Sequence, residues 1–151
     1  IGSDVVLGLK IKNTFLIGGK KYLKRFKRKL KLHVVLVNPG IKCLSKDIYS
    51  QNKQFSNSYQ KKFDLNFQNL FNLDSIRLEK NDLERVVFRL YPKIKALNTF
   101  ITEHENCIFS RLTGSGSTCV GYFKNSESAQ KAKKNIILKF PNYWCEKAET
   151  I

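Results

Sequence analysis

The sequence lacks methionine altogether, has three prolines and one tryptophan among its 151 residues, and contains no long apolar run. Its apolar stretches, such as residues 34–37, have the length of a β-strand, whereas a bilayer-spanning helix needs about 20 apolar residues. The first residues lack the three parts of a signal peptide, which are a charged segment, an apolar segment and a cleavage site. We therefore expect a cytoplasmic protein without a membrane-spanning helix, and we expect this chain, which begins at Ile1, to be part of a longer protein.

Acidic residues are also scarce, at 12 against 28 lysines and arginines, which gives a net charge of +16. Such a charge attracts polyanions, so a nucleic-acid-binding protein has to be considered. The densest basic run, residues 20–31, is interleaved with Tyr22, Leu23 and Phe26, a pattern typical of a strand with one buried face. Elsewhere the lysines are dispersed. We favour a solvated basic surface and keep a nucleic-acid-binding module as the alternative.

Metal-ligating and disulfide patterns are missing as well. The chain has no Cys-x-x-Cys pair, and neither His33 nor His104 has a cysteine or carboxylate at the spacing of a zinc site. We expect no structural metal and free thiols in a reducing compartment. The four cysteines are Cys43, Cys107, Cys119 and Cys145.

The hydrophobic pattern indicates one domain over residues 1–151, which is the right length for a single core. From residue 33 onward, the order is strand, helices, strand, strand, helix, strand, which predicts an α+β fold of the ferredoxin-like kind, an antiparallel sheet backed by helices. Residues 1–32 include two short strands around Gly18 and Gly19.

Helical spacing assigns the buried faces of the longer helices. Asn81 or Asp82 is the expected N-cap of the first, Pro92 separates the first from the second, and Asn125 or Ser126 begins the last. The expected strands are 34–37, 107–112, 119–123 and 143–147, and a short helix is expected at 45–50. The residues expected to be buried are Leu83, Val86, Val87 and Leu90 on the first of the longer helices, Ile94, Leu97 and Ile101 on the second, and Ala129, Ala132, Ile136 and Ile137 on the last.

Three short segments are candidates for chemistry, each with a simpler alternative. Residues 113–118 read Thr-Gly-Ser-Gly-Ser-Thr, small residues that let backbone amides approach a phosphate, although a plain hairpin loop explains them too. Asp4 follows Gly2 and Ser3, as a turn residue does, yet a carboxylate also serves as proton acceptor in phosphoryl transfer. For residues 81–84, Asn-Asp-Leu-Glu, helix capping is a sufficient explanation.

Taken together and in this order, these segments resemble the C-terminal portion of the GHMP kinases, which phosphorylate small-molecule alcohols with ATP and Mg²⁺. The resemblance covers essentially the whole chain. It implies that Asp4 is the catalytic aspartate, and that Thr113, Gly114, Ser115, Gly116 and Ser117 form the glycine-rich loop that supports the phosphate-binding region. Among the family, it is strongest to the branch that phosphorylates the 2-hydroxyl of a cytidine diphosphate substrate in non-mevalonate isoprenoid biosynthesis.

In that branch, Ser45 and Tyr49 fall where members contact the cytidine end of the substrate, with the aromatic ring stacked on cytosine. A tyrosine in a helix can equally pack on the sheet, so both roles stay open for Tyr49. The chain departs from the family where Val6 replaces a proline and Gly8 replaces a bulkier apolar residue.

The family's N-terminal lobe, with its catalytic lysine and ATP-binding loop, has no counterpart in these residues. We therefore expect the missing lobe to be a partner, residues 1–32 to pair with it, and the chain alone to be inactive. Another GHMP kinase with a different alcohol substrate is the closest alternative.

Overall fold

The computed structural model describes residues 9, 10, 12, 14–17, 22–25, 30–53 and 72–150. Contacts divide the chain into two units, residues 32–149 and residues 1–31 with 150–151, and each is considered by itself. Within the described part of the chain, no helix combines the length and the apolar character needed to cross a membrane.

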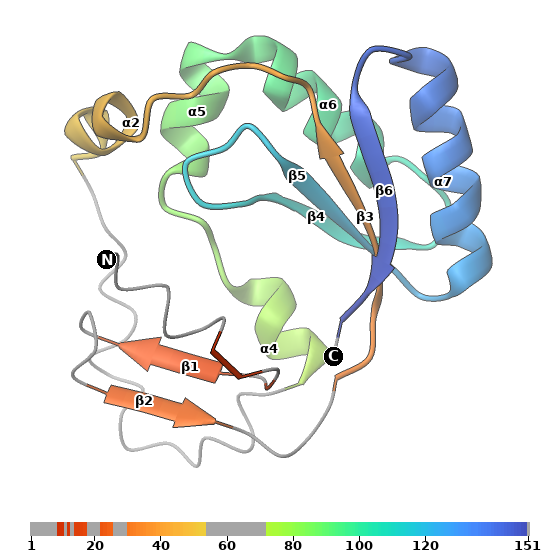
Figure 1. Ribbon diagram of the computed structural model, residues 1–151, viewed down its shortest axis with the longest axis horizontal. Coiled ribbons are helices and arrows are strands. Elements are labelled where there is room, and N and C mark those ends of the chain that lie inside the picture. The colour runs from red at the N-terminus through yellow and green to blue at the C-terminus, as the bar shows by residue number, and fades with distance from the viewer. Residues whose placement is uncertain are drawn as a thin grey trace. The chain divides into compact units, whose positions relative to one another are not determined.

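The larger unit is built on a four-stranded sheet with the order β4-β5-β3-β6, in which every neighbouring pair is antiparallel (Figure 1). The strands are β3 (His33–Asn38), β4 (Cys107–Leu112), β5 (Cys119–Phe123) and β6 (Trp144–Glu149). Valine, isoleucine and phenylalanine in these segments favour extended backbone. The sheet confirms the predicted antiparallel α+β architecture, including an edge position for the last strand.

One face of this sheet is covered by α6 (Pro92–Thr102) and α7 (Ser126–Lys139). Val37 lies opposite Cys119 on one side and Cys145 on the other, so the three side chains share that face. They join the predicted apolar stripes of the two helices in one continuous core. Its buried members from the sheet and these two helices include Val35, Val37, Ile94, Leu97, Ile101, Leu112, Cys119, Phe123, Ala129, Ala132 and Ile136.

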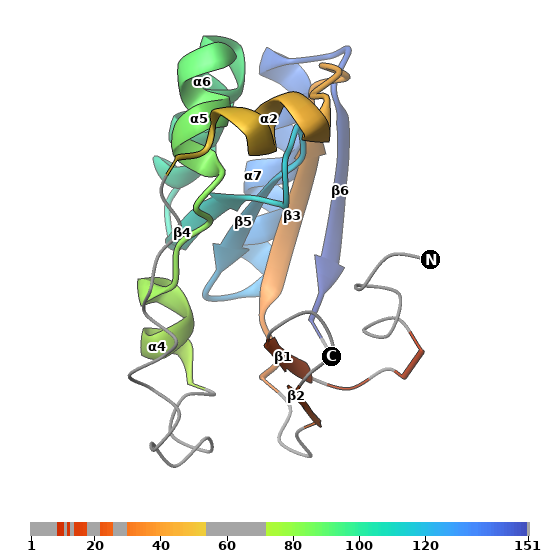
Figure 2. The same ribbon diagram turned by 90° about the vertical axis from the view of Figure 1, so that its left-hand side faces the viewer.

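Three shorter helices complete the unit: α2 (Ser45–Gln51), α4 (Leu73–Leu78) and α5 (Glu84–Leu90). The two views of the ribbon place α2 beside α5 and next to the turn that joins β4 to β5 (Figure 2). An Arg89 guanidinium nitrogen donates to Gln51 Oε1 across 3.1 Å, and Ile48 is completely buried, so α2 is anchored to α5 and to the core.

Two details of the predicted helices are wrong. Leu90 and Ile137 are 38% and 40% exposed rather than buried, because each stands at the margin of its apolar stripe, where the helix turns toward solvent. The N-cap of α5 is Leu83, without a side-chain hydrogen bond, instead of Asn81 or Asp82. Asn125, by contrast, caps α7 as predicted, since its side chain accepts from the Ser128 N–H.

The smaller unit contains an antiparallel pair, β1 (Thr14–Ile17) and β2 (Tyr22–Arg25), which confirms the two strands expected there. The glycine turn between them and Asp4 lie outside the described residues. Thr150 Oγ1 donates to the Leu30 carbonyl across 2.6 Å within this unit.

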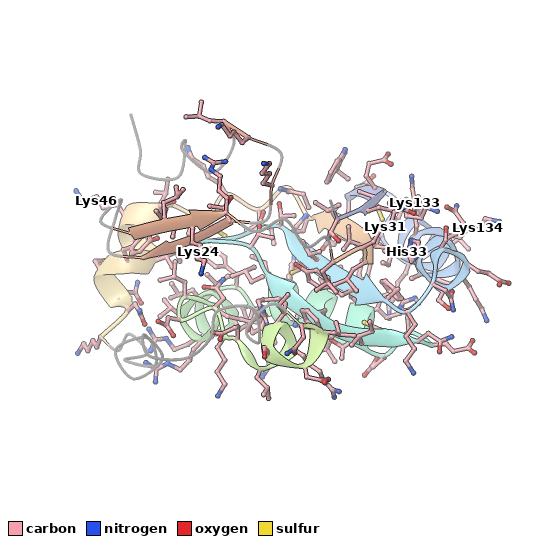
Figure 3. All side chains as sticks on the ribbon, turned by 90° about the horizontal axis from the view of Figure 1, so that it is seen from below. Lys24, Lys31, His33, Lys46, Lys133 and Lys134 are labelled. Carbon is pink, nitrogen blue, oxygen red and sulfur yellow. The ribbon has the colours of Figure 1, made fainter. Side chains whose placement is uncertain are left out.

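Basic side chains of the larger unit are spread over several elements. Lys46 on α2 lies at the opposite end of the view from Lys133 and Lys134 on α7 (Figure 3). Lys133 is paired with Glu146 at 2.8 Å.

Gly121 is predicted to be required for close packing of α6 on β5. A Cβ built on Gly121 would stand 2.4 Å from Ile101 Cγ2, far inside van der Waals contact. We expect Gly121→Ala to lower the free energy of unfolding by about 1–3 kcal/mol, measured by urea denaturation. Combination with Ile101→Ala is expected to cost less than the sum of the two single changes, since the clash is removed. Additive effects would contradict this contact.

Candidate active site

The predicted loop, residues 113–118, is a tight connection between β4 and β5. The Thr113 N–H donates to the Thr118 carbonyl and the Gly116 N–H to the Thr113 carbonyl, both at 2.9 Å. Gly114 and Gly116 have φ values of 50° and 85°, which favour glycine. A side chain at Gly116 would also crowd Leu112 Cδ1 at 3.2 Å. Backbone of this kind can direct successive N–H groups into one concavity, as an anion site requires.

Asn81 and Glu84 hold the start of this loop. Asn81 Nδ2 donates to the carbonyl oxygens of Leu112, at 2.9 Å, and Gly114, at 2.8 Å. Glu84 Oε1 accepts from the Leu112 N–H at 3.0 Å. Both polar backbone groups of Leu112 are thereby satisfied by side chains at the edge of the sheet.

The same asparagine also organises its own segment. Asn81 Oδ1 accepts from the Leu83 N–H at 3.0 Å, and the Glu84 N–H donates to the Asn81 carbonyl at 3.0 Å. The amide is therefore fixed in a turn just before α5, with its nitrogen directed at the loop. Capping, which was sufficient to explain residues 81–84 in the sequence, accounts for only part of what they do.

Burial raises the pKa of the Glu84 carboxyl above its ordinary value, although the Leu112 N–H and the charge of Arg111 act in the opposite direction. Burial likewise raises the pKa of the Cys119 thiol to about 12, with the charges of Glu84 and Cys43 adding to the effect. Cys119 is therefore a neutral thiol at the base of the loop, which agrees with the expected free thiols.

Asn38, at the end of β3, contacts the far end of the loop. Asn38 Nδ2 donates to Thr118 Oγ1 at 2.9 Å, and Ser117 Oγ donates to Asn38 Oδ1 at 3.4 Å. The same Oδ1 accepts from the Gly40 N–H at 2.7 Å. One amide thus connects the buried Ser117, the neighbouring threonine and the turn that leads toward α2.

Ser45, the first residue of α2, meets the loop directly. Its Oγ lies 2.8 Å from Ser115 Oγ, although 70 residues separate the two in the chain. Tyr49 follows one turn later, so it shares the helix face of Ser45. Its side chain is 55% exposed, which leaves the ring accessible rather than packed on the sheet.

The structure therefore brings Ser45 to the loop 113–117, with Tyr49 one turn further along α2, while Asp4 lies outside the described residues. Three residues with direct roles in holding the loop were not assigned to it from the sequence: Asn38, Asn81 and Glu84. The signal for Asn81 and Glu84 was their four-residue motif, which a helix start was enough to explain. Asn38 begins the sequence Asn-Pro-Gly, which is a common turn, so nothing in the sequence indicated a contact with the loop.

The chemistry of these groups suits a phosphate better than a metal ion. Backbone amides and the hydroxyls of Thr113 and Ser115 donate hydrogen bonds to anions. Among the described residues, no three His, Cys, Asp or Glu side chains come together in a cluster that could hold a metal. Glu84, the carboxylate at the loop, already accepts a backbone N–H. The described part of the chain thus contains a loop whose backbone and hydroxyl groups can donate to an anion.

The larger unit is an antiparallel sheet backed by helices, with a glycine-rich loop held at one end. Residues 57–142, more than half of the chain, match the family model described as GHMP kinases C terminal. The chain belongs to this family.

Individual proteins that are similar to this chain share one name. The chain is 36% identical over its whole length to 52% of a protein of Pelagibacter ubique (strain HTCC1062) named 4-diphosphocytidyl-2-C-methyl-D-erythritol kinase. It is 32% identical, over 95% of its length, to 50% of a protein of the same name from Wolbachia pipientis wMel. A crystal structure of 4-(cytidine 5'-diphospho)-2C-methyl-D-erythritol kinase has the same fold, with a TM-score of 0.69 at 22% identity over 97% of this chain and 53% of that one. The chain spans about half the length of the curated relatives it matches.

Asn81→Ala is predicted to destabilise the protein, because it leaves two loop carbonyls without their donor. The expected loss is about 1–3 kcal/mol in the free energy of unfolding, measured by urea denaturation. Asn135→Ala, at an exposed position of α7, is the matched control and is expected to leave stability unchanged or slightly raised. Equal effects of the two changes would contradict the role of Asn81.

Glu84→Gln is predicted to alter the pH dependence of stability, since glutamine retains an acceptor oxygen but carries no charge. Because the pKa of Glu84 is raised in the folded state, the folded protein binds more protons than the unfolded chain. Glu84 therefore lowers the free energy of unfolding as the pH rises from the ordinary glutamate pKa through the raised pKa. The unfolding free energy of the wild type minus that of the variant should therefore fall with rising pH and then level off.

Glu146→Gln supplies a control of opposite sign. The hydrogen bond and charge of Lys133 lower the pKa of Glu146. Its contribution to the free energy of unfolding is therefore present when the pH is above the ordinary glutamate pKa, and it is lost as the pH falls through the lowered pKa. The wild-type-minus-variant difference should rise with pH for Glu146 and fall for Glu84. Curves of the same sign would contradict the burial of the Glu84 carboxylate.

Proposed function

We propose that this chain is the C-terminal, substrate-side domain of a kinase that transfers the γ-phosphoryl group of ATP to the 2-hydroxyl of 4-diphosphocytidyl-2-C-methyl-D-erythritol. The product would enter isoprenoid precursor synthesis by the non-mevalonate route. An N-terminal lobe of the same protein would supply the catalytic lysine and most of the ATP contacts. The family membership and the names of the curated relatives support this proposal.

The single observation that carries the proposal is the contact between Ser45 Oγ and Ser115 Oγ at 2.8 Å. It joins the helix that bears the candidate cytidine contacts to the candidate phosphate loop. A kinase for a cytidine diphosphate alcohol needs to hold the base and the reacting phosphoryl group at a fixed separation, because a small misplacement costs much of the rate.

Each group has a definite task in this proposal. Tyr49 stacks on cytosine, Ser45 contacts the cytidine end, and residues 113–117 support the phosphate-binding region through backbone amides and hydroxyls. Asp4 orients the 2-hydroxyl and accepts its proton. Mg²⁺, bound with ATP, would neutralise charge on the phosphates, and its ligands would come from outside the described residues.

A second member of the same family is the alternative, because a structural likeness at 22% identity supports the fold alone. The exposed ring of Tyr49 favours the cytidine substrate, since a kinase for a simple alcohol has no use for an aromatic platform at that position. Comparing 4-diphosphocytidyl-2-C-methyl-D-erythritol with homoserine and mevalonate as substrates of the complete gene product distinguishes the two.

Asp4→Asn in the complete gene product that contains this chain is predicted to reduce kcat by orders of magnitude, with the KM of ATP nearly unchanged. The amide preserves shape but accepts a proton far less readily. Initial rates of ADP formation, with the cytidine substrate saturating, measure the effect. Turnover equal to that of the wild type would remove Asp4 from the chemistry.

Tyr49→Leu is predicted to raise the KM of the cytidine substrate by roughly 5- to 100-fold, the equivalent of one lost base stack. The KM of ATP should change little, because the ring is assigned to the other substrate. Tyr49→Phe is the matched control and retains the stacking surface. If leucine and phenylalanine behave alike, Tyr49 has no stacking role.

A further inference from the structure

Arg111, the residue of β4 just before the Leu112 peptide held by Asn81 and Glu84, makes contacts that the proposed catalytic roles leave unexplained. One guanidinium nitrogen, Nη2, donates to the carbonyl oxygens of Ile76, at 3.0 Å, Arg77, at 3.4 Å, and Glu79. These carbonyls belong to the last turn and the C-cap of α4. A cation at a helix C-terminus satisfies carbonyls that have no partner within the helix and interacts favourably with the helix dipole.

The guanidinium is held on its other side by an aromatic pair. Its carbon lies 4.9 Å from the centre of the Phe109 ring, which is stacked on Tyr122 at 4.3 Å between centres. Alternation along β4 puts Arg111 and Phe109 on the sheet face opposite Leu112 and the helices. The guanidinium is therefore placed by a cation–π contact with Phe109 and by hydrogen bonds to backbone carbonyls at once.

These contacts form one continuous set with those of Asn81 and Glu84. Arg111 binds the backbone at 76–79, and the next residues of that segment, Asn81 and Glu84, bind Leu112 and Gly114. The segment from α4 to α5 is thus attached along β4 and the first residues of the loop. Asn81 stands only two positions after Glu79 in the chain, so a shift at one end of this segment is transmitted to the other.

We propose that Arg111 is a positioning residue for the glycine-rich loop: by fixing the end of α4, it sets the position of Asn81 and Glu84 and through them the loop conformation that receives phosphate. The inference deepens the proposed kinase function and rests on it for its kinetic consequence. The structural consequence, an ordered loop, stands independently of any substrate.

Hydrogen–deuterium exchange of the complete gene product tests the structural consequence. We expect Arg111→Met to accelerate exchange of the amides at 112–118 by about tenfold or more, while β3 and α7 exchange as in the wild type. Arg111→Lys should give a smaller change than Arg111→Met, since an ammonium group keeps the charge and N–H donors for the same carbonyls. Phe109→Leu should give a smaller change in the same amides.

Lys131→Met is the matched control. Lys131 is an exposed cation on α7, paired with Glu105 at 3.3 Å, and its removal also costs one positive charge. It should leave exchange at 112–118 unchanged.

Steady-state kinetics tests the functional consequence. Arg111→Met should raise the KM of ATP by about tenfold and Arg111→Lys by less, and both should leave the KM of the cytidine substrate within about twofold. Both variants are expected to retain the wild-type pH profile of kcat, because Arg111 touches no reacting group.

Two results would overturn the inference. Unaltered exchange at 112–118 would show that the loop does not depend on Arg111, and accelerated exchange throughout the sheet would assign Arg111 to general stability alone. A wild-type protein without kinase activity would refute the proposed function, while the exchange data would still decide the role of Arg111.

Discussion

The structure around the candidate site depends on how the exposed edge of β4 is satisfied. An edge strand presents N–H and C=O groups that a neighbouring strand would otherwise pair. Here the side chains of Asn81 and Glu84 take the place of that strand at Leu112, and the same asparagine continues to the Gly114 carbonyl. Because these bonds lie where the strand becomes the loop, they fix the direction in which the glycine-rich segment leaves the sheet.

Other side chains hold the remainder of the loop. Asn38 holds its far end through Thr118 and Ser117, and Ser45 approaches its middle at Ser115. Three elements distant in sequence, β3, α2 and the beginning of α5, thus converge on six residues. In the proposed kinase, this convergence keeps a phosphate loop and a base-binding helix at one separation, which favours reaction between the groups they hold.

The hydrophobic pattern was enough to predict the architecture. The apolar run 34–37 predicted a buried strand, and the helical spacing of Ile94, Leu97 and Ile101 predicted a buried helix face. Val34, Val35 and Val37 and all three helix residues are buried, as predicted. Leu90 and Ile137 were misassigned because periodicity does not say how wide a buried stripe is. The glycine-rich loop was visible from composition, whereas Asn81 and Glu84 act across about 30 residues on backbone atoms, which carry no sequence signal. Ser45 and Tyr49 were predicted through family resemblance, and Asp4 stays a prediction because it lies outside the described residues.

In the proposed function, a protein containing this domain phosphorylates a cytidine diphosphate alcohol. Phosphorus NMR of the complete gene product with ATP, Mg²⁺ and 4-diphosphocytidyl-2-C-methyl-D-erythritol measures this reaction. One new phosphomonoester signal is expected to grow in equal amount with ADP, while the cytidine diphosphate signals persist. ATP consumption without a phosphomonoester, or no reaction by the folded protein, would contradict it.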